Sequence, residues 1–283
     1  MSDAYPQPRR RRSRWWIPAI AVVVVIAVAA AMVWLSSRGH KDGETSAPQA
    51  SQQTSTPASQ PGMATTGGGG NVTSDFWGRR VVVPSNPDGD VLEQHPVDPA
   101  NACDKSSYAR VPGDLQAQRT HTMSTLWSST DGPTGITESI PSGYSHTPQG
   151  AALAGWNYFS LYSVGGKIGL SSIMNFGGFS EDKKREIRSI PDQPEQERTR
   201  DRTKMVAPAA VKYLSCHDDQ VVVQYFLPIP DMNTGEADRP SYTLLQLPVK
   251  WVGGHWELNM DKNTNTGGNM VDSIDGEAVQ WDY

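Results

Sequence analysis

Histidine and cysteine are the residues of this chain best suited to act as bases, nucleophiles or metal ligands, and it contains six of the first and two of the second. The histidines are scattered, without the spacing that places two ligands on one turn of a helix. The chain also has no G-x-S-x-G, H-E-x-x-H or C-x-x-C pattern and no phosphate-binding loop. We therefore expect no catalytic residue, no metal site and no cofactor.

His146 is the histidine in the most informative context, because it lies in the stretch GYSHTPQGAALAGWNYF, Gly143 to Phe159. Thr147 is a good helix cap, Pro148 suits the first position of a helix, and an apolar run follows. The stretch therefore predicts the start of a helix, with His146 just outside it. The sequence places no carboxylate or thiol to activate this histidine, so we interpret it as a surface or packing residue.

His217 lies beside Asp218 and Asp219 in a short link between two predicted strands. A cation site in this turn is one interpretation, but links between strands are polar for ordinary reasons. The preceding residue, Cys216, does not form a thiolate pair with His217, because neighbours on a strand point to opposite faces. We expect structural roles here.

The two cysteines, Cys103 and Cys216, leave two alternatives open. A disulfide between them would close a loop of over 100 residues. In the chain-entropy model such a bond stabilises the fold by roughly 4 to 5 kcal/mol. The other alternative is a pair of buried thiols.

A membrane anchor is the first of the elements that position these residues. Trp15 to Leu35 form 21 uncharged positions, enough to cross a bilayer core of about 30 Å as a helix. A cleaved secretory signal has a shorter apolar region of about 7 to 15 residues, so we predict a retained transmembrane helix. Five arginines lie in the basic tail 1–14, and positive residues stay inside the cell. We therefore expect a single-pass protein of the cell membrane with a cytoplasmic N-terminus and everything from Ser36 outside.

Charge limits the partners of the outer part. Residues 1–14 hold five Arg and one Asp, so the rest of a chain with net charge −5 carries −9. An acidic outer part argues against nucleic-acid binding, which needs clustered cations, and the arginine cluster is explained by topology and anionic lipid. The expected partners are therefore the membrane and envelope proteins, and a homo-oligomer is left open.

Composition divides the outer part into three segments. Residues 36–75 contain Ser, Thr, Gln, Pro, Ala and Gly with almost no large apolar side chain, which predicts a disordered tether. Residues 76–260 predict the folded extracytoplasmic domain. Residues 261–283 are acidic with few apolar side chains, which predicts a tail that is at best loosely docked.

The folded domain is expected to place helices before strands. After a proline-rich lead-in with few regular elements, the pattern predicts a strand, a helix, two charged helical pieces and two hairpins. The strand is expected at 122–128 and the helix from Pro148 onward. The charged helical pieces are expected at about 180–189 and 195–205. The first hairpin pairs 209–216 with 220–227, and the second pairs 242–251 with the segment after Gly253-Gly254. The order predicts an α+β domain in which helices pack on one face of a curved antiparallel sheet.

Such a curved sheet leaves a concave mouth in which a small ligand can bind. Trp251, Trp256, Tyr225 and Phe226, on predicted strands, are candidates to line it, with His146 as a further candidate for a ligand or partner surface. The alternative is that the aromatic residues belong to the core, which is the commoner place for aromatic side chains on strands.

Several stretches together resemble an actinobacterial family of membrane-anchored or secreted proteins without an assigned activity. They are WGRRVVVPSNPDG from Trp77, SSTDGPTGI from Ser128, GYSHTPQGAALAGWN from Gly143, WVGGHWEL from Trp251 and IDGEAVQW from Ile274. The resemblance covers about residues 76–283, and Thr-Pro-Gln-Gly-Ala is its most specific part. Members tend to occur among genes of integrative and conjugative elements, which implies a part in cell-envelope transfer machinery. The order of helices and strands is also similar to the cystatin-like cone of bitopic assembly factors of type IV secretion systems.

Two functions are therefore expected. The first is a non-catalytic, membrane-anchored scaffold whose outer domain contacts proteins of a conjugation or other envelope complex. The alternative is an outer domain that binds a small apolar or cell-wall molecule.

Overall fold

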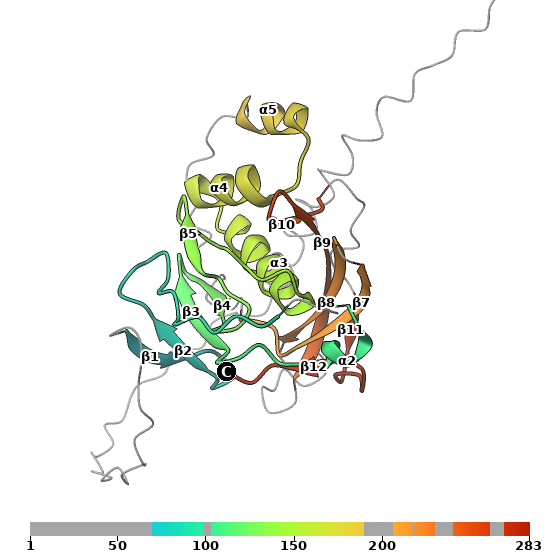
Figure 1. Cartoon of the computed structure of the whole chain (residues 1–283). Coiled ribbons are helices and arrows are strands. Elements are labelled where there is room, and N and C mark those ends of the chain that lie inside the picture. Colours follow the sequence, from blue (N-terminus) through green and yellow to red (C-terminus); the bar gives the residue numbers. More distant parts are fainter. Residues whose placement is uncertain (1–69, 99–102, 190–205, 218, 230–239, 261–268) are drawn as a thin grey trace, which may run out of the picture. The chain divides into compact units, whose positions relative to one another are not determined.

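The computed structural model describes residues 70–98, 103–189, 206–217, 219–229, 240–260 and 269–283 (Figure 1). The predicted basic tail, transmembrane helix and nearly all of the predicted tether lie outside these ranges, as does the charged piece at 195–205. Within the described ranges, no helix combines the length and the apolar composition needed to span a bilayer.

The larger sheet contains both predicted hairpins. Its strands are β7 (Ala210–His217), β8 (Gln220–Ile229), β9 (Ser241–Val252), β10 (His255–Leu258), β11 (Met270–Val271) and β12 (Val279–Gln280). They are ordered β10-β9-β8-β7-β12, with β11 also paired to β9, and every pair is antiparallel. Gly253 and Gly254 connect β9 to β10 at positive φ of 57° and 90°, which a tight two-residue hairpin requires. The predicted hairpins and the α+β class are confirmed.

A second sheet has four strands in the order β1-β2-β3-β4. They are β1 (Asn71–Ser74), β2 (Arg80–Val83), β3 (Gln116–Thr120) and β4 (Met123–Trp127), and β5 (Gly135–Thr137) with β6 (Ile140–Ser142) forms a separate hairpin. Strands β2 and β3 are parallel, while the other neighbours are antiparallel. The strand predicted at 122–128 is confirmed as β4. The lead-in at 76–121 contains few regular elements, as expected, and its strands β2 and β3 were not predicted because strands of four or five residues show too little periodicity to be recognised.

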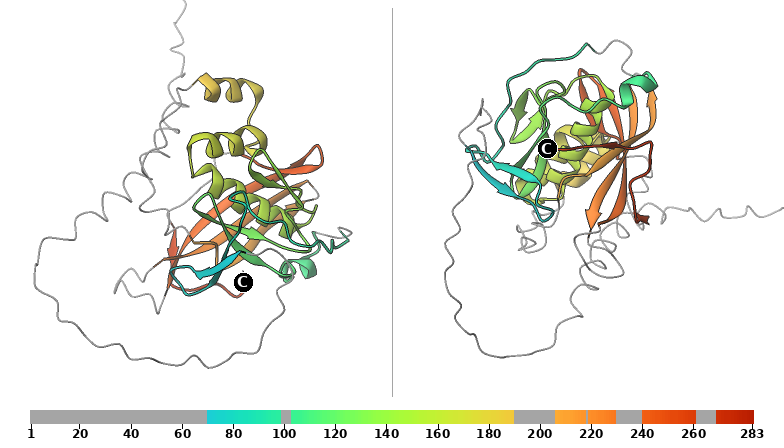
Figure 2. Two further views of the ribbon diagram at one scale, coloured as in Figure 1. Left: turned by 90° about the vertical axis from the view of Figure 1, so that its left-hand side faces the viewer. Right: turned by 90° about the horizontal axis from the view of Figure 1, so that it is seen from below.

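Helix α3 (Pro148–Tyr162) lies between the two sheets (Figures 1 and 2). It packs against β4 on one side and against β8, β9 and β10 on the other, and all its residues except Phe159 and Tyr162 are buried. Asn157 pairs with the backbone of β4, accepting from Leu126 N and donating to Leu126 O at 2.8 Å each. Helix α3 thus packs on the larger sheet as expected, but the second sheet on its other side was not predicted. A helix that is apolar all round predicts burial on every side.

Close packing of α3 on the larger sheet depends on Gly155. A Cβ atom at this position would lie 2.6 Å from the hydroxyl of Tyr225 and 3.0 Å from Cγ2 of Val249. The Tyr225 hydroxyl donates a 2.8 Å hydrogen bond to the carbonyl oxygen of Ala152 in the same helix. Small residues on this face therefore let α3 and the sheet approach closely.

In the described part of the chain, three further helices accompany α3. They are α2 (Lys105–Tyr108), α4 (Gly166–Phe176) and α5 (Glu181–Ser189). Helix α5 confirms the helical piece predicted at 180–189, and none of its residues is buried. Helix α4 was not predicted, because its glycines and serines are poor helix formers. Packing stabilises it instead, since the Ser172 hydroxyl donates to the carbonyl oxygen of Tyr158 in α3 at 2.8 Å.

The predicted boundaries of the domain are wrong at both ends. Asn71–Ser74, assigned to the tether, form β1 and pair with β2. The segment assigned to a loosely docked tail contributes β11 and β12 to the larger sheet, and Trp281 is only 1% exposed. Backbone pairing and one buried indole hold this segment, and neither can be read from an acidic composition.

A disulfide joins Cys103 to Cys216. It connects the residues just before α2 to β7, two segments 113 positions apart. Of the two alternatives that the sequence leaves open, the structure contains the disulfide.

Candidate functional site

Two of the stretches that carry the family resemblance meet at the N-terminus of α3, around the carboxylate of Asp131. Its Oδ1 accepts hydrogen bonds from the hydroxyls of Thr147 at 2.7 Å and Ser145 at 3.0 Å. Its Oδ2 accepts from the hydroxyl of Thr130 at 2.6 Å. The guanidinium of Arg110 donates to both oxygens at 2.6 Å, in a bidentate pair. These residues form what we call the cap network.

The carboxylate in the cap network stays ionised. Asp131 is fully buried, and burial alone would raise its pKa, but hydrogen bonds from Arg110, Thr130 and Thr147 outweigh that effect and lower the pKa below its usual value. The hydrogen bonding of Arg110 to Asp131 in turn raises the pKa of the guanidinium. Arg110 also donates to Gln149 Oε1 at 2.9 Å, which links the pair to the first turn of α3. The network is therefore a fixed ion pair with its acceptors satisfied.

The cap network is suited to positioning a helix and poorly suited to catalysis. Thr147 accepts the Gly150 amide at 3.0 Å, as a helix cap does, while its hydroxyl proton goes to Asp131. A general base needs a pKa close to the working pH, whereas the pKa of this carboxylate is lowered. The predicted cap at Thr147 is confirmed. Asp131 and Arg110 were missed, because nothing in the sequence relates them to a threonine many positions away.

His146 lies at the surface beside β9 and β10. Its ring stacks on Trp251 with 4.2 Å between ring centroids and 14° between planes, and it is tilted against Trp256 at 5.3 Å. Its Nε2 is 3.6 Å from Oδ1 of Asp219, beyond hydrogen-bond distance, and the Asp219 side chain is 74% exposed. This geometry fits a packing residue at the rim of the fold.

The aromatic residues considered for a ligand mouth are mostly core residues. Trp256, Tyr225 and Phe226 are each at most 1% exposed. The indole N–H of Trp256 donates to the carbonyl oxygen of Ser145 at 2.8 Å, just before α3. Only Trp251 and His146 reach the surface. The mouth expected at Tyr225 and Trp256 is therefore filled by α3 and the segment before it, while Phe226 packs against Tyr242.

Two of the other histidines in the described ranges, His121 and His255, each lie beside one carboxylate. His121 Nε2 lies 2.7 Å from Asp88 Oδ1, and His255 Nε2 lies 3.2 Å from Glu257 Oε1. His217 is exposed at the end of β7, and Asp218 lies outside the described residues. In the ranges that the structure describes, no three histidine, cysteine, aspartate or glutamate side chains are grouped closely enough to bind a metal ion.

Strand β1 is an open edge of the four-stranded sheet. Among the described strands it pairs with β2 alone, and each of its residues is exposed. Three apolar side chains gather at this β1–β2 hairpin: Val72 and Phe76 are each 57% exposed, and Val83 is 37% exposed. Figure 2 shows the hairpin projecting at one side of the domain. The sequence did not identify this edge, because the polar residues before it extended the predicted tether over β1.

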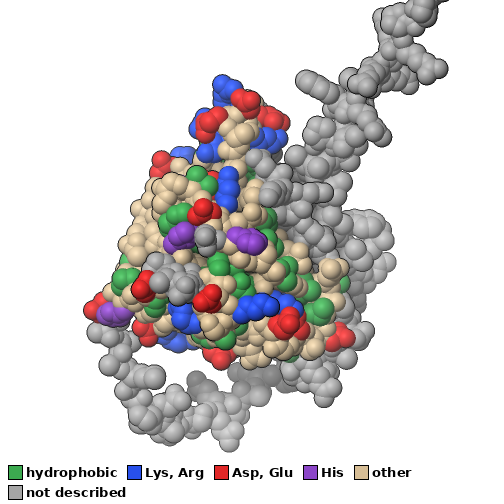
Figure 3. Space-filling view, turned by 45° about the vertical axis from the view of Figure 1, so that its right-hand side comes forward, with side chains coloured by type: hydrophobic (Ala, Val, Ile, Leu, Met, Phe, Trp, Pro, Cys, Tyr) green, Lys and Arg blue, Asp and Glu red, His purple; other side chains and the backbone are tan. Residues whose placement is uncertain are grey.

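The molecular face shown in Figure 3 carries acidic and basic side chains side by side. On α5, Lys183 pairs with Glu186 at 3.0 Å and Lys184 with Glu181 at 3.4 Å. At the opposite end of the domain, Lys212 lies 2.6 Å from Glu277. Charges of both signs are thus interleaved on this surface.

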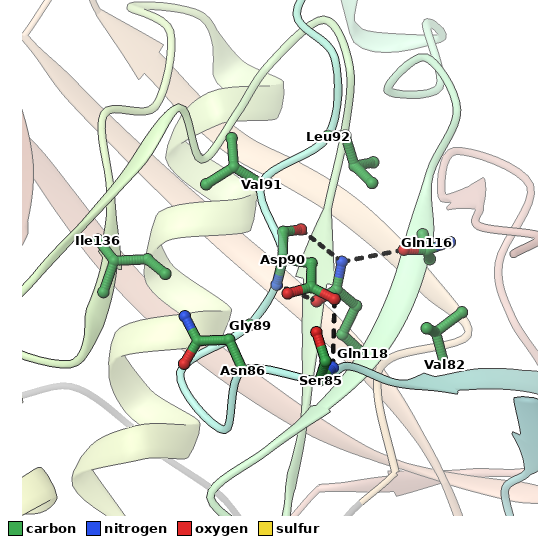
Figure 4. Close-up of a pocket in the computed structure, with 10 residues that line it drawn as sticks. All are labelled: Val82, Ser85, Asn86, Gly89, Asp90, Val91, Leu92, Gln116, Gln118 and Ile136. Atoms are coloured by element: carbon green, nitrogen blue, oxygen red, sulfur yellow. Dashed lines mark hydrogen bonds between the residues drawn. The ribbon is translucent and has the colours of Figure 1, made fainter. Parts of the chain in front are cut away.

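A hollow of about 350 Å³ opens on the outer face of the four-stranded sheet (Figure 4). Strands β2 and β3 form its floor, a loop at 85–92 forms one wall, and β5 lies opposite. The lining residues are Val82, Ser85, Asn86, Gly89, Asp90, Val91, Leu92, Gln116, Gln118 and Ile136. The loop contains the end of the stretch WGRRVVVPSNPDG, for which the sequence indicated no role beyond the resemblance.

Comparison with known proteins finds one family. The model of a domain of unknown function, DUF8175, matches residues 82–279, which include β3 to β11 and half of β2 and of β12. No curated protein and no solved structure matches the chain.

Proposed function

This chain belongs to the DUF8175 family, a domain of unknown function, and we propose that it is a membrane-anchored, extracytoplasmic interaction protein without catalytic activity. Its outer domain contacts a protein of the cell-envelope machinery, and conjugative transfer is the system that the sequence resemblance favours. In this proposal, α3 and the larger sheet are the part of the domain that is similar to a cystatin-like cone. The four-stranded sheet has no counterpart in that similarity.

The observation that carries the proposal is the open edge at β1. The four residues Asn71–Ser74 contain no charge and no proline, the features with which proteins usually protect an edge strand from pairing. Backbone N–H and C=O groups on the free side of such a strand can add a strand from a partner. Val72, Phe76 and Val83 supply exposed apolar surface around it. Edge and side chains together form a contact surface for an extended segment of a partner.

The disulfide between Cys103 and Cys216 supports the extracytoplasmic placement. Disulfides persist in oxidising compartments and are rare where glutathione and thioredoxin keep thiols reduced. The predicted span Trp15 to Leu35, with its arginines on the N-terminal side, supports the same placement.

Photo-crosslinking of the full-length protein in its own cells tests the contact. A photoreactive benzoylphenylalanine at Val72 or Phe76 is expected to give a covalent adduct with a membrane or envelope protein identified by mass spectrometry. Met270, which is 49% exposed on the other sheet, is the matched control position and is expected to give no such adduct. Ser74→Pro, which removes a backbone donor from the free side of β1, is expected to abolish the adduct at Val72. Equal adducts from all three positions, or none from any, would contradict the proposal.

The compartment is tested separately. Rapid acid quenching of intact cells followed by alkylation and mass spectrometry is expected to recover Cys103 and Cys216 joined. Recovery of both as alkylated thiols would place the domain in a reducing compartment and refute this part of the proposal.

A further inference from the structure

The hollow on the four-stranded sheet has a rigid, pre-organised wall. The buried side chain of Gln118 holds the loop, because its amide donates to the carbonyl oxygen of Asp90 and accepts from the Asp90 amide, both at 2.8 Å. Gly89 sits at φ 106°, and a Cβ atom there would lie 2.1 Å from the ring of Trp127. The backbone at Gly89 is therefore in contact with the ring of Trp127 beneath the loop. A binding wall held in this way has little conformational entropy to lose when a ligand arrives.

The hydrogen bonds within the wall also orient its remaining polar atoms. Gln116 uses its Oε1 to accept from Gln118 at 2.9 Å, which leaves its NH₂ group as a donor. Asn86 uses its Oδ1 to accept from the Asp88 amide at 3.1 Å, which leaves its NH₂ group as a donor too. Asp90 accepts from the Ser85 amide through Oδ2 at 3.3 Å, and among the described residues Oδ1 has no hydrogen-bond partner. Two amide donors and one carboxylate oxygen therefore remain for a ligand.

Figure 4 shows how these groups lie. The carboxylate of Asp90 is near the middle of the view, between Asn86 and Gln116, with Ile136 and Val91 on the side of β5. Val82 adds an aliphatic surface at the floor. No lysine, arginine or histidine is among the lining residues. The nearest acidic neighbour in the loop, Asp88, is already paired with His121.

This combination selects the charge of the ligand. A partly buried carboxylate without a cationic neighbour attracts a positive group and disfavours an anion. The two amide donors suit carbonyl oxygens, and the aliphatic side chains suit a short hydrocarbon chain. We propose that the hollow binds a short aliphatic peptide that carries a primary ammonium group, with the ammonium at Asp90 and peptide carbonyls at Gln116 and Asn86. The open edge of β1 plays no part in this site.

Calorimetric titration of the full-length chain, purified in a mild detergent, tests the proposal with a defined probe. The probe is acetyl-Ala-Lys-Ala-amide, whose only charge is the lysine ammonium. Two control peptides replace lysine with norleucine, which keeps the hydrocarbon chain, or with glutamate, which reverses the charge. Saturable binding of the lysine peptide is expected, with an affinity at least tenfold above that of the norleucine peptide. No binding of the glutamate peptide is expected.

Asp90→Asn is the decisive variant, because asparagine keeps the size of the side chain and an oxygen that can accept the Ser85 amide. It is expected to lower the affinity for the lysine peptide to that of the norleucine peptide. Asp282→Asn is the matched control, since Asp282 is exposed on the far end of the chain, and it is expected to bind like the original protein. Near-ultraviolet circular dichroism checks that both variants are folded.

Ile136→Ala tests the aliphatic wall independently of charge. It is expected to lower the affinities for the lysine peptide and the norleucine peptide by the same factor. Equal affinity for the lysine and norleucine peptides in the original protein would overturn the proposal. Unchanged lysine-peptide binding in folded Asp90→Asn would also overturn it, as would no saturable binding of any peptide.

Discussion

Replacing Asp131 with asparagine tests the role assigned to the cap network. Asparagine keeps the shape of the side chain, but it removes the negative charge beside Arg110 and replaces one acceptor oxygen with an NH₂ donor that faces other donors. Removing one partner of a buried ion pair costs about 3–5 kcal/mol. The Arg110 side chain is 31% exposed, and water can partly solvate the guanidinium left alone, so we expect the lower end of this range, about 3 kcal/mol.

Urea unfolding of the full-length chain, followed by tryptophan fluorescence, measures this change. A loss of about 3 kcal/mol corresponds to a melting temperature lower by about 6–12 °C in a domain of about 200 residues. Asp282→Asn, at an exposed aspartate outside the network, is the control and is expected to change stability by less than about 0.5 kcal/mol.

The effect of Asp131 also has a characteristic dependence on pH. Because the pKa of Asp131 is lowered in the folded state, its stabilising contribution is complete above the unfolded value of about 3.9 and is lost as the pH falls through the folded value. Asparagine does not titrate, so the difference in stability between the two proteins is expected to be constant near neutral pH and to narrow only below about pH 4. An Asp131→Asn protein as stable as the Asp282→Asn control, or a difference that persists unchanged at about pH 2, would refute the reasoning.

Three further substitutions test the packing, each measured by the midpoint and slope of urea unfolding. Gly155→Ala is expected to lower the free energy of unfolding by about 1–3 kcal/mol, because its Cβ would lie 2.6 Å from the Tyr225 hydroxyl. Gly276→Ala is the control and is expected to leave stability unchanged, since a Cβ there has no atom within 4 Å. Equal effects of the two substitutions would contradict the close approach of α3 to the sheet. Cys216→Ser is expected to cost about 4–5 kcal/mol under oxidising conditions and nothing in excess reductant, and a cost that survives reduction would point to packing instead. Trp281→Ala is expected to cost about 3–5 kcal/mol, and a cost below about 1 kcal/mol would restore the view of a loosely docked C-terminal segment.

The elements that the sequence predicted correctly are those with a complete local signal. Thr147 and Pro148 mark the start of α3, and the Gly253-Gly254 pair marks the turn between β9 and β10. In both cases the conformation is imposed by residues within a few positions of each other. The α+β class followed from these elements.

The features that the sequence did not predict depend on residues far apart in the chain. The sequence shows that α3 is apolar, but only the fold shows that β4 covers the side opposite the larger sheet. The hollow needs Gln118 of β3 to bind the backbone at Asp90, a contact that no local pattern encodes. Strand β1 was missed for a different reason: a four-residue edge strand gains its stability from its neighbour, and its own composition is that of a linker.

The position of β12 determines when this domain can finish folding. Strand β12 pairs with β7, and the amide of Trp281 donates to the carbonyl oxygen of Ala209 at 2.9 Å, so the larger sheet is incomplete until the indole of Trp281 is in place. During synthesis this residue leaves the ribosome after every other strand of the domain. The sheet therefore closes only once the chain up to Trp281 has emerged, and until then β7 keeps an unpaired side that newly made chains have to shield from one another.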